Sequence, residues 1–178
     1  ADTPAWDPEG NCLYYLGMRE FAPAISGVEF NFATTRSRGI FALALRKDVK
    51  PPFAPESDEV TITKEEGKPA AEKAKEKDKA KPAADLAIDF DGLAARVARV
   101  PVQADNYSGL QAKKDYLIYR VQGTSYYGRD SERPPSLRIY SLKERKETTL
   151  LDDVRGFTLS RDGAKLLAAQ GRNWFVMD

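Results

Sequence analysis

Histidine is missing from this 178-residue sequence, and cysteine occurs once. The absence of histidine removes the commonest general base, the usual Ser–His and Cys–His pairs and most zinc sites. A single cysteine excludes an internal disulfide, and the place of Cys12 within an apolar run predicts a buried, inert thiol. We therefore expect no catalytic residue, no metal site and no cofactor in this chain.

A dominant charge and long apolar segments are also lacking. The sequence has 28 Lys and Arg against 27 Asp and Glu, a formal net charge of +1, which gives no field to attract nucleic acid or an anionic membrane. The longest apolar stretches, such as residues 40–45, are far shorter than a membrane span. Residues 1–7 show no signal peptide. Nucleic-acid binding and membrane insertion are thus not expected, and these features leave the compartment open.

What the sequence does contain is a series of short β-rich runs. Each has about five or six residues and is bounded by Gly, Asp, Asn or Pro, as strands are. Helical periodicity is missing, apart from a turn or two at residues 91–96. The sequence therefore predicts an all-β fold, with strands in the runs at 12–16, 40–45, 96–102, 116–121, 137–142 and 148–151.

Two distant segments share a tight turn that closes on glycine. Residues 7–10 (Asp-Pro-Glu-Gly) and 160–163 (Ser-Arg-Asp-Gly) both lie between an aromatic strand and a second strand, as in a β-hairpin. Residues 107–119 form a degenerate third copy. The interval from Asp115 to Gly163 is 48 residues (163 − 115), within the spacing of propeller blades, about 40 to 50 residues. An ordinary β-sandwich with similar turns is the alternative.

The repeat predicts a partial β-propeller of four-stranded antiparallel blades. The first blade covers residues 1–55 and 85–103, the second covers 104–153, and a third starts at 154 and runs to 178. An insertion at 56–84 interrupts the first blade, and from 68 to 84 it is almost entirely Lys, Glu, Ala and Pro. Such a tract offers little apolar surface to offset the entropy of ordering, so a flexible charged loop is expected. A docking tail for a charged partner is the alternative.

The repeat resembles the hairpins of TolB-like propellers, and other segments resemble the propeller of bacterial tricorn-type serine peptidases. The residues that carry the second resemblance are those at 18–23, 27–32, 45–48, 52–55, 88–93 and 100–102. The resemblance implies a large peptidase in which propellers precede a PDZ module and an α/β core with a serine nucleophile. No position in this chain matches a catalytic motif of that family, so the chain is similar to a segment of such an enzyme.

Residues that could carry chemistry are better explained as turn residues. The pairs Asp89 with Asp91 and Asp152 with Asp153 lie at strand ends, where carboxylates accept hydrogen bonds. Ser125 and Ser160 lie outside any Gly-x-Ser-x-Gly elbow. The aromatic loop at 123–130 is the best candidate for substrate contact, because loops between blade strands line the faces of a propeller. Its candidate substrate-binding residues are Tyr126, Tyr127 and Arg129.

Our first functional hypothesis is therefore a non-catalytic propeller segment that scaffolds a serine peptidase and limits access to unfolded peptides. Its partners would be peptide substrates and the rest of the parent peptidase. The alternatives are a stand-alone TolB-like interaction propeller and the propeller of a prolyl-oligopeptidase-like enzyme. Two and a fraction blades leave strand edges unpaired, so self-association is also expected. The resemblance favours an extracytoplasmic (periplasmic) location, with the cytoplasm as the alternative.

The insertion gives a first prediction. Limited trypsin digestion of the native chain should cleave first within residues 56–84, where lysines are frequent and folding stability is low. Mass spectrometry of the earliest fragments measures this. Protection of the segment, with first cuts in the predicted strands, would contradict the interpretation as a flexible loop.

Overall fold

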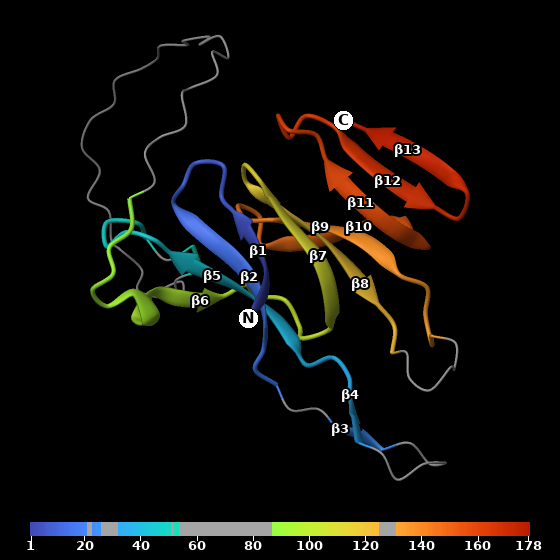
Figure 1. The fold of residues 1–178 in the computed structure, drawn as a ribbon, viewed down its shortest axis with the longest axis horizontal. Helices are drawn as coiled ribbons and strands as arrows, with labels where there is room; N and C mark the ends of the chain where they lie inside the picture. The colour runs from blue at the N-terminus through green and yellow to red at the C-terminus, as the bar shows by residue number, and fades with distance from the viewer. Residues whose placement is uncertain (21–22, 26–31, 51, 54–86, 125–130) are drawn as a thin grey trace, which may run out of the picture.

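The computed structural model describes residues 1–20, 23–25, 32–50, 52–53, 87–124 and 131–178 (Figure 1). These residues form three larger antiparallel sheets and one small hairpin. The predicted insertion at 56–84 lies outside the described residues. The prediction of an all-β fold built from four-stranded antiparallel sheets is confirmed.

The first sheet has the strand order β1-β2-β5-β6. Its strands are β1 (Asp2–Trp6), β2 (Cys12–Met18), β5 (Arg38–Ala44) and β6 (Val97–Arg99). Between β2 and β5 the chain forms the hairpin of β3 (Pro23–Ile25) and β4 (Phe32–Thr34), which projects away from the larger sheets (Figure 1). The sequence did not predict this hairpin. The strand expected at 96–102 is shorter, because the 3₁₀ helix η1 (Leu93–Arg96) precedes it and Pro101 follows soon after it.

The second sheet has the order β10-β9-β8-β7, and the third has the order β11-β12-β13. Each strand pairs antiparallel with its neighbour in the chain, so each sheet is a simple meander. The bounds are β7 (Asn106–Lys113), β8 (Tyr116–Gln122), β9 (Ser136–Ser141), β10 (Lys146–Asp152), β11 (Val154–Leu159), β12 (Leu166–Gln170) and β13 (Asn173–Met177). The first strand of each sheet lies at one edge, and β7 contacts both β1 and β11.

The second sheet is buried on both faces, and β8 shows this most clearly. Its Leu117, Tyr119 and Val121 belong to the core shared with the first sheet, while Ile118 belongs to the core shared with the third. Alternate residues of a strand point to opposite faces, so an uninterrupted apolar run marks a strand with cover on both sides. The larger core also holds Tyr14, Leu16, Ile40, Tyr107 and Tyr140, and the smaller holds Leu137, Val154, Leu166 and Ala168.

A partly buried polar network lies at the edge of the larger core. The hydroxyl of Tyr119 donates to Glu147 at 3.1 Å, and one guanidinium nitrogen of Arg138 donates to both carboxylate oxygens of Glu147, at 3.1 and 3.2 Å. The ring of Tyr107 packs edge to face on Tyr119, with 5.2 Å between the centroids. Burial, followed by the charge of Glu147, raises the pKa of both tyrosines, so they act only as neutral hydrogen-bonding groups.

The segment that follows the insertion is held on the edge of the first sheet by an arginine. Arg96 donates from Nε to the carbonyl of Ala44 at 3.1 Å and from Nη1 to the carbonyl of Asp91 at 2.8 Å. Lys47 adds a backbone hydrogen bond to the Asp89 carboxylate at 2.8 Å and an ion pair with Asp91 at 2.6 Å. These contacts fix where the chain rejoins the sheet and set the position of β6.

The partly buried network gives a stability prediction. Glu147→Gln removes the charge that pairs with Arg138 and leaves a partly buried guanidinium without its anion. We expect a loss of about 1–3 kcal/mol in the free energy of unfolding, the usual cost of breaking a charged hydrogen bond in a core. Urea denaturation followed by circular dichroism measures it. Glu144→Gln, at an exposed position in the turn after β9, is the matched control and should change little. Equal effects of the two substitutions would contradict a role for the network.

Candidate functional site

The innermost strands of the three sheets run into three tight turns. In the β1–β2 turn the N–H of Gly10 donates to the carbonyl of Asp7 at 2.9 Å, and in the β11–β12 turn that of Gly163 donates to Ser160 at 2.9 Å. Gly10 has φ 71 and Gly163 has φ 67, a conformation that glycine adopts without strain. In the shorter β7–β8 turn Asp115 takes this conformation, with φ 65. The two glycine turns predicted from the repeat therefore have the same local geometry.

Two side chains of the β11–β12 turn, those of Ser160 and Asp162, form hydrogen bonds within the turn itself. The hydroxyl of Ser160 donates to Asp162 at 2.5 Å and accepts the N–H of Lys165 at 2.9 Å. Asp162 also accepts the N–H of Ala164 at 3.0 Å, and these hydrogen bonds hold the pKa of its carboxyl below the ordinary value. Ser160 is thus a turn residue, as the sequence indicated.

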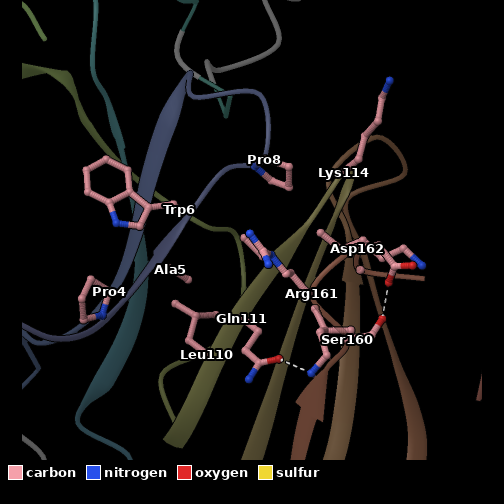
Figure 2. A pocket seen from close by; sticks show the side chains of 14 residues that line it. Pro4, Ala5, Trp6, Pro8, Leu110, Gln111, Lys114, Ser160, Arg161 and Asp162 are labelled. Carbon is pink, nitrogen blue, oxygen red and sulfur yellow. Dashed lines mark hydrogen bonds between the residues drawn. The ribbon is translucent and has the colours of Figure 1, made fainter. Parts of the chain in front are cut away.

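A groove of about 480 Å³ lies between the three turns (Figure 2). Its walls come from β1, from the end of β7 and from the β11–β12 turn, so residues far apart in the sequence share it. The lining has an apolar part, which includes Pro4, Ala5, Pro8, Leu110 and Leu159, and a charged part, which consists of Lys113, Lys114, Arg161 and Asp162.

Direct contacts between the sheets set the width of the groove. The N–H of Leu159 donates to Oε1 of Gln111 at 2.9 Å, which ties β11 to β7 (Figure 2). Gly109, at a bulge in β7 with φ 63, lies against Phe157, and an added Cβ would come within 3.2 Å of that ring. Lys114 forms an ion pair of 3.3 Å with Glu9 on the β1–β2 turn. At Gly109, the absence of a side chain allows β7 to approach Phe157 of β11 closely.

The charged side chains of the groove differ in direction. Arg161 extends from the β11–β12 turn across the groove towards β1, while Asp162 turns away from it towards Ser160 (Figure 2). The indole of Trp6 points to the other side of β1, where it is half exposed (Figure 2). The guanidinium of Arg161 consequently faces the apolar wall.

The substrate-contact residues predicted from sequence, Tyr126, Tyr127 and Arg129, lie outside the described residues. Their described neighbours Thr124 and Glu132 contact the connection between β4 and β5: the hydroxyls of Thr124 and Thr35 are 2.6 Å apart, and Glu132 pairs with Arg36 at 3.2 Å. Because β8 runs from the β7–β8 turn to this loop, these neighbours lie at the end of the second sheet opposite the groove.

The two aspartate pairs lie at turns and strand ends, as the sequence indicated. Asp89 accepts from the backbone of Lys47, Asp91 pairs with its ammonium, and the carbonyl of Asp152 accepts from Gln170 at 2.7 Å. Asp153 has φ 54 at the tight connection between β10 and β11. Across the described ranges, no cluster of three or more His, Cys, Asp or Glu could hold a metal ion. No helix in that part of the chain is long and apolar enough to cross a membrane.

Comparison with known proteins identifies the family. Residues 2–178 match the family model described as the tricorn protease second β-propeller domain. The chain belongs to this family. The tricorn part of the resemblance drawn from sequence is thereby confirmed. The TolB-like part is not, and the relatives include archaeal proteins as well as a protein from Streptomyces.

Similar curated proteins carry tricorn names. The chain is 24% identical over 169 residues to a putative tricorn-like protease C-terminal subunit of Sulfurisphaera tokodaii, covering 93% of this chain and 17% of that protein. It is 24% identical over 174 residues to a tricorn protease homolog of Saccharolobus solfataricus, with 93% and 14% covered. It is 27% identical over 173 residues to tricorn protease homolog 1 of Streptomyces coelicolor, with 93% and 16% covered.

The chain thus spans less than a fifth of the length of these relatives. The same holds for a solved structure, the crystal structure of the tricorn protease. The superposition has a TM-score of 0.62 at 20% sequence identity and covers 94% of this chain and 15% of that one. At this identity the likeness concerns the fold, and it places the three sheets of this tricorn propeller segment in a propeller arrangement.

The state of the one cysteine gives a prediction about reactivity. Burial, with a smaller effect of Asp7, raises the pKa of the Cys12 thiol to about 11. The thiolate is the reactive form, so at pH 8 the native chain should react with a disulfide reagent about 100-fold more slowly than the urea-unfolded chain, whose thiol has a pKa of about 8.5. Absorbance of the released thiolate measures both rates. Native and unfolded rates within a few-fold would contradict the burial of Cys12.

Proposed function

We propose that this chain is a non-catalytic part of a protease propeller that supports the enzyme and restricts substrate access to unfolded peptides. The observation that carries the proposal is the groove between the turns of β1, β7 and β11, at the inner edges of three sheets. The inner strands of a propeller surround its central channel, so a groove formed by them lies where a polypeptide in transit would pass.

The mechanism of selection is steric. A groove of about 480 Å³ has room for a few residues of extended chain and excludes a folded domain. Its apolar wall, with Pro4, Pro8 and Leu110, would contact the side chains of a bound peptide without requiring a particular peptide sequence. Ser160 and Asp162 form hydrogen bonds within their own turn, which suits a structural role for both. In this proposal the hydrolysis belongs to other parts of the protease.

Photo-crosslinking tests the proposal. A small protein with disulfides, labelled with a benzophenone, is offered to the chain either folded or reduced and alkylated, so that sequence and label are the same. We expect the unfolded form to crosslink at residues 4–8, 110–114 and 159–163, and the folded form to give little product there. Mass spectrometry maps the sites, and competition by unlabelled unfolded protein checks saturation.

Two crosslinking results would contradict the proposal. Equal crosslinking of folded and unfolded forms would contradict steric selection and would favour a propeller that binds folded partners. Crosslinks spread over the whole surface in proportion to exposure would contradict the groove as the contact site.

A further inference from the structure

Positive charge predominates on the groove between the three turns. Three of its lining residues are cationic, namely Lys113, Lys114 and Arg161, and one, Asp162, is anionic. The chain as a whole is nearly neutral, with a formal net charge of +1, so this balance is a local feature of the groove. The charged residues lie at the β7–β8 turn and the β11–β12 turn, which come together only in the folded chain.

Two of these four charged side chains already have partners within the chain. Lys114 pairs with Glu9 at 3.3 Å. Asp162 accepts hydrogen bonds from Ser160 and Ala164 and is turned away from the groove (Figure 2). Its lowered pKa means that it stays ionised at neutral pH, and its oxygens remain directed into the turn. Neither group is therefore a free partner for a ligand.

Arg161 is different, because it has no hydrogen-bond or ion-pair partner within the described part of the chain. Its guanidinium extends over the apolar wall formed by residues such as Pro8 and Leu110 (Figure 2). Lys113 lines the same groove and is likewise without a partner among the described residues. A guanidinium presents a planar set of donors that matches both oxygens of a carboxylate, and a low-dielectric wall strengthens such a pair.

We propose that the groove binds acidic side chains of extended peptides, with Arg161 pairing with a carboxylate and Lys113 supporting a second one. The proposal rests on the proposed function, because it assumes that unfolded peptides enter the groove. Two cations without partners suit a segment with several acidic side chains better than a single terminal carboxylate. The apolar wall would meanwhile contact the aliphatic part of a Glu side chain.

Fluorescence anisotropy with labelled peptides tests this at about 0.15 M salt, where distant charges are largely screened. The peptides have one length and one apolar framework and carry Glu, Gln or Lys at the variable positions, each with a free or an amidated C-terminus. We expect the Glu peptide to bind about three- to tenfold more tightly than the Gln peptide, the range for one charge-assisted contact in a partly exposed site. The Lys peptide should bind most weakly, and amidation should change little.

Variants of the chain test whether Arg161 causes the preference for the Glu peptide. Arg161→Gln should remove most of the preference for Glu over Gln, and Arg161→Lys should retain part of it, because the charge remains without the planar fork. Arg172→Gln is the matched control. It removes the same charge from an exposed position in the β12–β13 turn, at the end of the third sheet away from the groove. Unfolding curves confirm that both Gln variants keep the stability of the parent chain.

The outcomes separate this proposal from the one on which it rests. Groove crosslinks with unfolded protein, together with equal affinity for Glu and Gln peptides, would overturn the preference for acidic peptides and leave steric selection intact. A preference that depends on a free C-terminus would overturn the assignment to side chains. Equal losses in the Arg161 and Arg172 variants would show a general charge effect and would also overturn it. If no peptide binds and no groove crosslink forms, both proposals fail.

Discussion

The burial of the second sheet on both of its faces is the constraint on which the rest of the structure depends. One face of β8 packs against the first sheet through Leu117 and Tyr119, and the other packs against the third sheet through Ile118. A sheet with two apolar faces is stable only when both are covered, so the flanking sheets are held on either side of it. This packing brings β1 and β11 to the two sides of β7.

The groove follows from this packing. Where the inner strands approach, the contacts are made by small or slender groups: Ala5 and Leu110 in the larger core, and Gly109 against Phe157 on the other side. Towards the other end of β7, the packed rings of Tyr107 and Tyr119 belong to the core shared by the first two sheets. Core residues such as Ala5 and Leu110 line the groove together with residues of the turns, so core packing and turn sequence both set its shape.

Much of the fold was predictable from sequence, because its determinants are local. The glycine turns at residues 7–10 and 160–163 need φ > 0 at Gly10 and Gly163, and the run at 116–121 reads as a β-strand. The β3–β4 hairpin was not predictable, since its strands have only three residues each. The Glu147 network was missed for a different reason. A strand of the composition of β10 reads as exposed, and only the fold brings Glu147 to Arg138 and Tyr119.

The groove itself could not have been found from sequence, although its turns were. The sequence predicts a turn at residues 160–163, and the roles of Ser160 and Gly163 agree with it. A turn assignment does not indicate, however, that the side chain of Arg161 projects over the groove. In the turn at 160–163 the side chains of Ser160 and Asp162 accept backbone N–H groups, and Gly163 supplies the positive φ. Arg161, at the second position, has no such task. Its long side chain is thus free to project, and the packing of the three sheets decides that it projects over an apolar hollow. A turn that repeats from blade to blade for structural reasons can in this way carry a blade-specific group at its second position without any cost to the hairpin.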